Sequence, residues 1–377
     1  MSEHHWTRCS WGDLAVLEYG KALRDYRQRD AAVRVYGTNG PIGWTDNALG
    51  CGPTVVVGRK GAYRGLHYAP GPFWVIDTAY WLRPTVRIDT RWAYYQLLTQ
   101  DINGRDSGSA IPSLSRSDFA TLPVDLPPLS EQRAIAEVLG ALDDKIEANK
   151  RMAKSIQELL AATWSERFSN PPGEWERREI GELVEIVGGS TPRTSIPEFW
   201  DGGVNWATPK DLSKLSTRVL RKTKRTVTES GLSQISSGLL PAGTVLLSSR
   251  APIGYLAVAR IPVAINQGFI ALRPNHILPA VWLLEWLASN MGSIRDRANG
   301  TTFQEISKAS FRPIPVAVPP DPLLRAWAGS ADALFDRLVA ADEETEALAA
   351  LRDTLLPKLL SGELRVHDAK KVPEEMV

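Results

Sequence analysis

The chain carries two copies of one pattern, about 190 residues apart. The segment Ser115–Pro128 (SRSDFATLPVDLPP) recurs 192 residues later as Ser307–Pro320 (SKASFRPIPVAVPP). Upstream, the tripeptide Leu-Arg-Pro at 82–84 returns at 272–274. Solenoid proteins stack many much shorter units, so a long repeat in two copies predicts a duplicated domain instead.

Each copy consists of a globular part followed by a long helix. The globular parts are rich in Gly, Pro and Trp, and they contain short apolar runs such as Thr54–Val57 and Thr244–Leu247 that are typical of strands. In the segments that follow, apolar residues recur at alternating spacings of three and four, which predicts two helices that can pair. The alternative is that each helix lies on its own globular domain.

The chain therefore divides into five segments. We expect two globular domains at 1–128 and 171–320, two spacer helices at 129–170 and 321–365, and a tail at 366–377. The predicted fold class is α/β (α+β), with short strands in the domains and long helices between them.

The charge of the chain is unevenly distributed. Its formal net charge is only +1, but residues 171–320 carry +5 and residues 321–377 carry −5. Such a distribution would suit DNA on some faces and protein on others.

The sequence contains no motif of a known catalytic centre. It has no Gly-rich phosphate loop, no His or Cys set at metal-binding spacing and no recognisable nucleophile–base pair. Asn170–Gly173 resembles the Asn-Pro-Pro-aromatic motif of adenine methyltransferases, but Gly173 replaces the aromatic residue, so we interpret the segment as a linker. We expect a binding protein without catalytic residues, metal or cofactor of its own. The alternative is a nuclease or methyltransferase whose site is not recognisable from motifs.

Cysteine usage and hydropathy indicate the compartment. Cys9 and Cys51 are too few for a disulfide framework, and no segment approaches the roughly 18–20 apolar residues that span a bilayer. We expect a cytoplasmic protein that does not contact a membrane.

The candidate DNA-binding residues are basic or polar side chains in uninterrupted basic runs, in turns or beside strand-like runs. A run of five positive charges between Arg218 and Arg225 is the densest, and we expect it to contact phosphates. Asn39 could equally form the tip of a hairpin turn. The full set is Asn39, Arg59, Lys60, Arg64, Arg193, Lys210, Arg218, Arg221, Lys222, Lys224, Arg225, Ser249, Arg250, Asn266, Gln267, Thr302 and Gln304.

Several of these segments resemble the specificity (S) subunits of type I restriction-modification systems (the HsdS family), and together they cover nearly the whole chain. The resemblance of the globular parts lies in Val35–Gly43, Val57–Gly61, Gly188–Pro192, Trp206–Leu212, Leu247–Gly254 and Asn266–Phe269. The resemblance of the helices lies in Leu126–Ala136, Leu142–Ile146 and Leu351–Leu364. The chain departs from the family at Asp321–Leu324, where a second Glu-Gln-Arg helix start is usual.

The resemblance implies a division of labour. Two target-recognition domains would each read one half of a bipartite, asymmetric DNA site and would be separated by an antiparallel coiled coil of the two helices. The helices would recruit two methyltransferase (M) subunits and, through them, restriction (R) subunits, so that S-adenosylmethionine, ATP and Mg²⁺ would bind to those partners. The helix residues implied to bind subunits are Gln132, Arg133, Leu142, Ile146, Leu355 and Leu359. An S-like scaffold without working partners is the alternative.

An insertion in the central helix tests whether the helices set the gap between the half-sites. Four residues placed between Ala148 and Lys150 add roughly 6 Å of helix, close to two base pairs at about 3.4 Å each. We expect both half-site sequences to persist while the gap lengthens by about one or two base pairs. Sequencing of methylated bases in cells that hold the chain and its partners measures this. An unchanged gap with retained activity would contradict the spacer role.

Overall fold

The computed structural model forms two compact units, and each long helix contributes to both. The described residues are 6–26, 31–61, 64–104, 113–300 and 304–366. Unit 1 comprises Met1–Glu147 and Glu346–Val377, and unit 2 comprises Ala148–Thr345.

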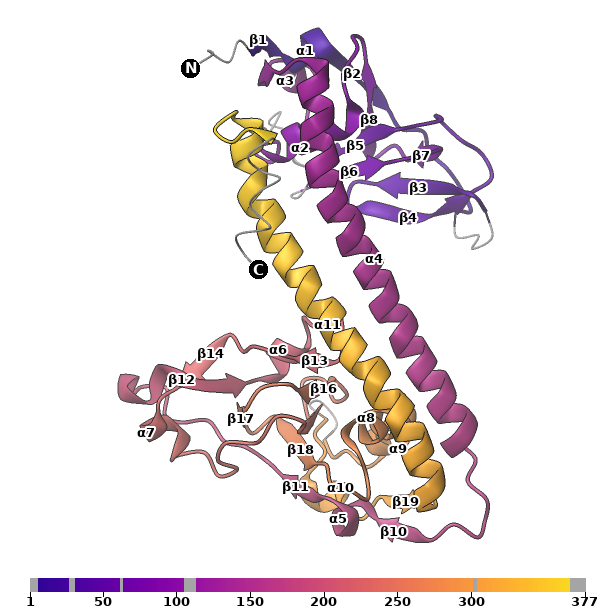
Figure 1. Cartoon of the computed structure of the whole chain (residues 1–377), viewed down its shortest axis with the longest axis vertical. Coiled ribbons are helices and arrows are strands. Elements are labelled where there is room, and N and C mark those ends of the chain that lie inside the picture. The colour runs from indigo at the N-terminus through magenta and orange to yellow at the C-terminus, as the bar shows by residue number, and fades with distance from the viewer. Residues whose placement is uncertain (1–5, 27–30, 62–63, 105–112, 301–303, 367–377) are drawn as a thin grey trace. The chain divides into compact units, whose positions relative to one another are not determined.

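Unit 1 contains a four-stranded antiparallel sheet and a three-stranded sheet (Figure 1). The larger sheet has the spatial order β2 (Ala15–Tyr19), β8 (Ala79–Pro84), β5 (Thr54–Gly58) and β6 (Leu66–Ala69). The smaller sheet has the order β4 (Gly40–Thr45), β3 (Val33–Gly37) and β7 (Phe73–Val75). The remaining elements are the paired strands β1 (Thr7–Ser10) and β9 (Pro123–Leu126) and the helices α1 (Trp11–Leu14), α2 (Thr90–Leu98) and α3 (Arg116–Ala120). Every residue of β5 is buried, because this run of β-branched residues occupies the interior of the sheet.

Unit 2 contains a five-stranded sheet and a three-stranded sheet. The larger has the order β11 (Glu185–Val187), β18 (Phe269–Arg273), β15 (Val245–Ser248), β16 (Leu256–Ala259) and β13 (Val219–Leu220). The smaller has the order β14 (Arg225–Val227), β12 (Trp200–Ala207) and β17 (Ala264–Ile265). The remaining strands are β10 (Arg177–Glu179) and β19 (Pro315–Ala317), which pair. The helical segments are α5 (Ile180–Leu183), η1 (Pro197–Phe199), α6 (Pro209–Leu212), α7 (Glu229–Leu232), α8 (Ala280–Ser289), α9 (Met291–Asp296) and α10 (Lys308–Phe311).

The two units share a common topology, to which unit 2 adds the strand β13, and this supports the predicted duplication. In each smaller sheet the central strand pairs antiparallel with one neighbour and parallel with the other. In each larger sheet the order β2-β8-β5-β6 corresponds to β11-β18-β15-β16. The helix after β8 or β18 also repeats a detail: its third residue is a tryptophan, Trp92 or Trp282, which is at most 1% exposed.

The two long helices pair in antiparallel fashion, as predicted. Each has 40 residues: α4 covers Leu129–Phe168 and α11 covers Asp321–Leu360. In unit 1, Arg352 of α11 donates to Asp143 of α4 at 2.8 Å. In unit 2, Asn149 donates to Glu344 at 2.8 Å, and Trp327 donates through Nε1 to the Thr163 hydroxyl at 3.2 Å. Residues with higher numbers on α4 thus contact residues with lower numbers on α11, as antiparallel helices do.

The helices also complete the core of each unit. In unit 1, Leu139 of α4 and Leu359 of α11 belong to the same buried cluster as Trp92. In unit 2, Leu160 of α4 and Trp327 of α11 join the cluster around Trp282. The alternative of two unpaired helices, each on its own domain, is therefore wrong.

Glu344→Ala tests the polar pair in the helix seam. Asn149 is only 1% exposed, so removal of its acceptor would leave a buried donor unsatisfied at a cost of about 1–3 kcal/mol. We expect urea unfolding to show this loss, and we expect Asn149→Leu added to Glu344→Ala to restore much of it. Glu343→Ala, on the exposed neighbour, is the control and should change stability by less than about 0.5 kcal/mol. Equal effects of the two single changes would contradict this role of the pair.

Candidate nucleic-acid interface

The basic run of unit 2 connects β13 to β14, and its first two arginines make ion pairs within the unit. Arg218 lies 3.4 Å from Glu285 of α8, and Arg221 lies 2.9 Å from Asp342 of α11. Glu285 is only 4% exposed; burial raises the pKa of its carboxyl group, and the charge of Arg218 opposes that shift. These arginines therefore hold the strand against the helices, and the phosphate contacts expected of the run stay a prediction.

The later part of the run is exposed. Lys222, Lys224 and Arg225 are exposed, and so is Lys210 on α6. The backbone N–H of Lys224 donates to Asp211 of α6 at 2.9 Å, which brings α6 beside the run. The guanidinium of Arg225 lies over Trp200, with Cζ 3.5 Å from the ring centroid. The fold thus gathers exposed cations along the β14 edge of the smaller sheet.

The polar residues after β15 and β17 mainly brace a cluster of loops. Ser249 is 2% exposed, and its backbone N–H and carbonyl bond Gly268 and Ile306; the expected contact of its side chain with DNA stays a prediction. Asn266 accepts from the backbone of Gly268 at 2.9 Å. Arg250 forms an ion pair with Glu305 at 3.6 Å.

Three further candidates of unit 2 lie at the surface. Gln267 is exposed and accepts a hydrogen bond from the Thr191 hydroxyl. Arg193 and Gln304 are also exposed, whereas Thr302 lies outside the described residues.

In unit 1 the candidate DNA-binding residues differ in exposure and in their contacts. Asn39 is exposed in the turn of the β3–β4 hairpin, so the hairpin alternative describes its backbone. Arg59 lies 4.9 Å from the Tyr19 ring centroid and donates to the Asp77 carbonyl at 3.3 Å. Lys60 is exposed.

Arg64 differs from the other candidates of unit 1 because its side chain is buried. It is 2% exposed, and its guanidinium donates to the carbonyls of Ile102 and Asn103 at 3.1 and 2.6 Å. Backbone carbonyls thus hold this buried guanidinium in a structural role, and the expected DNA contact of Arg64 stays a prediction.

Two arginines of unit 1 beside aromatic rings were not among the candidates: Arg34 is half-buried and Arg116 is exposed. Arg34 lies over Trp44 on the neighbouring strand, at 4.3 Å, and Arg116 lies 5.6 Å from the ring of Tyr19, which is 48% exposed. The alternation of Val33-Arg-Val35 could have placed Arg34 on the face opposite the buried valines, but its aromatic partner depends on the strand register.

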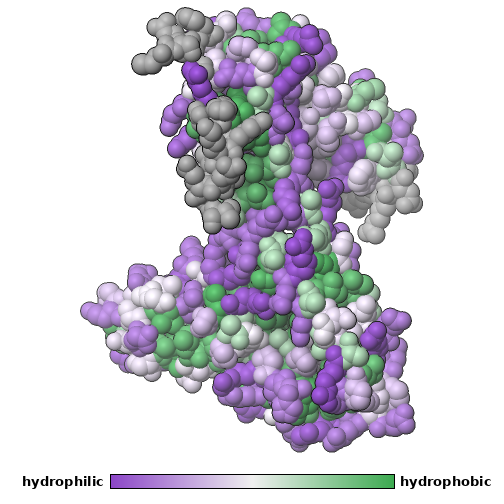
Figure 2. Space-filling view, viewed as in Figure 1, coloured by the Kyte–Doolittle hydropathy of each residue, from purple (hydrophilic) through white to green (hydrophobic). Residues whose placement is uncertain are grey.

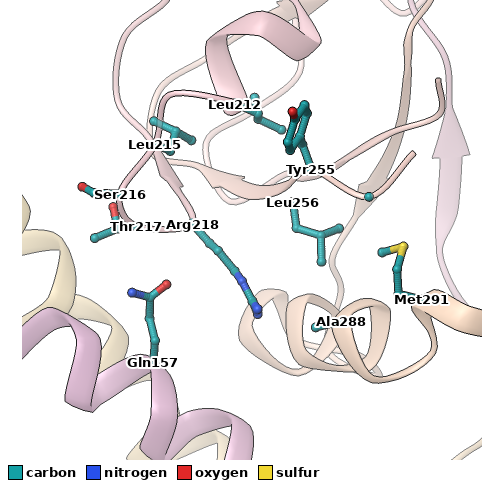
Figure 3. A pocket seen from close by; sticks show the side chains of 11 residues that line it. Gln157, Leu212, Leu215, Ser216, Thr217, Arg218, Tyr255, Leu256, Ala288 and Met291 are labelled. Carbon is teal, nitrogen blue, oxygen red and sulfur yellow. The ribbon is translucent and has the colours of Figure 1, made fainter. Parts of the chain in front are cut away.

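A cavity of about 400 Å³ lies in unit 2 between the segment that leads into β13, the β15–β16 turn, α8 and α4 (Figure 3). The side chain of Arg218 points along it toward α8, where Glu285 holds the guanidinium. Gln157, Tyr255 and Met291 are among the other lining residues. The cavity therefore adjoins the ion pair that holds β13 in place.

Comparison with known proteins identifies the family. The family described as "Type I restriction modification DNA specificity domain" matches residues 38–158 and 172–322. The chain belongs to this family.

Individual members of the specificity family share low sequence identity with parts of this chain. The type I restriction enzyme MjaIX specificity subunit of Methanocaldococcus jannaschii is 35% identical over 150 residues, which cover 39% of this chain and 35% of that protein. The EcoR124I/EcoR124II specificity subunit of Escherichia coli is 23% identical over 224 residues, which cover 56% of this chain and 54% of that protein. The chain spans between 35% and 62% of the length of the curated relatives compared.

One solved structure shows the fold of the whole chain. The crystal structure of the S subunit of a type I restriction-modification system from M. genitalium has a TM-score of 0.72 and 20% identity, and the match covers 96% of this chain and 97% of that one. The fold of the specificity family therefore extends over both units and both long helices.

Most of the helix residues that the resemblance implies to bind partner subunits are buried against other parts of the same chain. Ile146, Leu355 and Leu359 are between 1% and 4% exposed, and Leu142 packs against the unit 1 core. Gln132 is 2% exposed; its side chain accepts from the backbone of Asp89 and donates to Pro127. These five residues therefore contact other parts of this chain, and their role in binding subunits stays a prediction.

Arg133 is exposed on α4 and therefore remains a candidate residue for subunit binding. Figure 2 shows mostly hydrophilic residues along the outward face of this helix, with a few apolar ones among them. Leu159 is 46% exposed.

Two kinds of site were not found in the described parts of the chain. No cluster of three or more His, Cys, Asp or Glu side chains there could hold a metal ion. Among the same residues, no helix has the length and hydropathy needed to span a membrane.

Arg221→Ala tests the attachment of the basic run to α11. Asp342 is only 17% exposed, so loss of its partner should cost about 1–3 kcal/mol. We expect a lower midpoint of thermal unfolding, followed by circular dichroism. Lys224→Ala, on the same run and exposed, is the matched control and should stay within about 0.5 kcal/mol of the unchanged chain. If Arg221→Ala behaved like that control, the ion pair would not secure the run.

Proposed function

We propose that this chain is the DNA-reading specificity subunit of a type I restriction-modification complex. It binds double-stranded DNA at a bipartite, asymmetric sequence, and each unit reads one half. The family match to both halves of the chain carries the proposal. The shared topology of the units supports it, because two similar domains with different surface residues can read two different short sequences.

The exposed cations beside β14 fit the contact with the DNA backbone. Lys222 and Lys224 supply point charges for phosphates, which give affinity that does not depend on sequence. Arg218 and Arg221 act indirectly, since their ion pairs with Glu285 and Asp342 hold this segment in place.

The chain recognises DNA and leaves catalysis to its partners. In this proposal, two methyltransferase subunits that use S-adenosylmethionine, and restriction subunits that use ATP and Mg²⁺, bind to it through the exposed faces of α4 and α11. The recognition domains correspond to 1–128 and 171–320, with the spacer helices at 129–170 and 321–365 and the tail at 366–377.

Selection from a randomised duplex DNA library tests the proposal. The purified full chain, incubated with the library and recovered with bound DNA, should enrich two short fixed sequences separated by a gap of constant length. Single-stranded DNA of the same library is the control and should give no such pattern. A single continuous motif, or no enrichment, would contradict the proposal. Methyl transfer or cleavage by the purified chain would favour the alternative of a self-sufficient enzyme.

A further inference from the structure

The smaller sheet of each unit contains an arginine paired across two strands with a tryptophan. The two residue types exchange strands between the units. In unit 1, Arg34 on the central strand β3 faces Trp44 on β4. In unit 2, Trp206 on the central strand β12 faces Arg225 on β14. The two pairs occupy equivalent positions, because Arg34 and Trp206 are each the first residue of the central strand that pairs with the parallel neighbour.

In both units the guanidinium lies over an indole ring, which is the pair partner Trp44 in unit 1 and chiefly the neighbouring Trp200 in unit 2. The Cζ of Arg34 lies 4.3 Å from the Trp44 centroid, and that of Arg225 lies 3.5 Å from Trp200 and 5.5 Å from Trp206. A cation over an aromatic face is attracted by the quadrupole of the ring, and stacking leaves the N–H groups at the edge of the guanidinium available.

The aromatic platform of unit 2 is itself fixed. Trp200 and Trp206 are 7% and 3% exposed and meet edge to face, with centroids 5.0 Å apart. Their Nε1 atoms donate to the carbonyls of Arg193 and Ser190, at 3.2 and 3.3 Å. Arg225 is exposed on top of this platform, so its guanidinium is positioned before any ligand arrives.

Arg34 and Arg225 differ in their contacts from the arginines that form ion pairs within unit 2. Within the described part of the chain, the guanidinium groups of Arg34 and Arg225 have no hydrogen bond or ion pair. In contrast, carboxylates engage Arg218, Arg221 and Arg250. A ligand can therefore bind the N–H groups of Arg34 and Arg225 without first breaking an ion pair.

We propose that Arg34 and Arg225 are equivalent base-reading residues, each of which donates two hydrogen bonds to a guanine in the major groove. The inference rests on the proposed function and names the residue that reads in each unit. Guanine presents the O6 and N7 acceptors side by side, and the planar fork of arginine matches this spacing. The nearby Lys222 and Lys224 are flexible point charges and suit phosphates instead.

The substitutions Arg34→Lys and Arg225→Lys test the assignment, because lysine keeps the charge and loses the planar fork. Each full-length variant is incubated with the randomised duplex library used for the unchanged chain, and bound DNA is sequenced. We expect Arg225→Lys to lose the preference for guanine at one position of one half-site, by about 5- to 150-fold, and to leave the other half-site unchanged. Arg34→Lys should do the same in the opposite half-site. Thermal unfolding should match that of the unchanged chain.

Arg83→Lys and Arg273→Lys are the matched controls. Both arginines lie on the larger sheets, and each forms an ion pair at 2.8 Å, with Glu18 or Glu185. These variants should select the same sequence as the unchanged chain.

Three outcomes would overturn the assignment. An unchanged motif in Arg34→Lys and Arg225→Lys would show that neither arginine reads a base. A uniform loss of affinity on all sequences, with a shallower salt dependence, would show that they contact phosphates. If the unchanged chain itself enriches no bipartite sequence, the proposed function fails and the inference falls with it, and this result is distinct from the first two.

Discussion

The antiparallel pairing of α4 and α11 is the interaction on which both units depend. Along the seam, Ile135 and Leu139 of α4 and Leu355 and Leu359 of α11 join the core of unit 1. Further along, Leu160 of α4 and the first turns of α11 join the core of unit 2. Each buried leucine removes apolar surface from water, a gain of about 1.5–3 kcal/mol. Neither globular part therefore has a complete core without a segment of both helices.

A hydrogen bond in unit 1 and ion pairs in unit 2 then fix each globular part to its segment of the helix pair. In unit 1, Asp143 of α4 accepts from Tyr95 of α2 at 2.7 Å and from Arg352 of α11 at 2.8 Å. Burial and this carboxylate together raise the pKa of Tyr95. In unit 2, Arg221 and Arg260 reach α11, where Asp342 and Asp336 receive them. The negative charge concentrated after residue 320 is thus partly neutralised inside the molecule.

The sequence predicted the duplication, the strands and the helix pair, because each leaves a periodic or repeated pattern. Pairing partners distant in the chain leave no such pattern. Arg218 and Arg221 looked like free cations because their carboxylates lie 67 and 121 residues away. Arg64 and Ser249 looked polar and accessible because local pattern does not reveal burial. Arg34 was missed since only the strand register brings it over Trp44.

Five of the helix residues assigned to partner subunits are largely buried within the chain, which the sequence pattern does not reveal. An apolar seam on a helix shows that something packs there, and it does not show whether the partner is another chain or the other helix. Leu355 and Leu359 satisfy the same pattern in either case. An exposed residue such as Arg133 is different, because it is available to another chain. Its exposure depends on which face of α4 the helix pairing leaves uncovered.

The division of the helices between the units also has a consequence for the order in which the protein matures on the ribosome. Unit 2 is one continuous stretch, Ala148–Thr345, whereas unit 1 begins at Met1 and is completed only by residues from Glu346 onward. Synthesis delivers domains from the N-terminus onward. Here the unit that emerges first must wait for Leu355 and Leu359, so the unit that emerges second can close its core earlier. Throughout that interval, the apolar face formed by Ile135 and Leu139 lacks its final cover from α11.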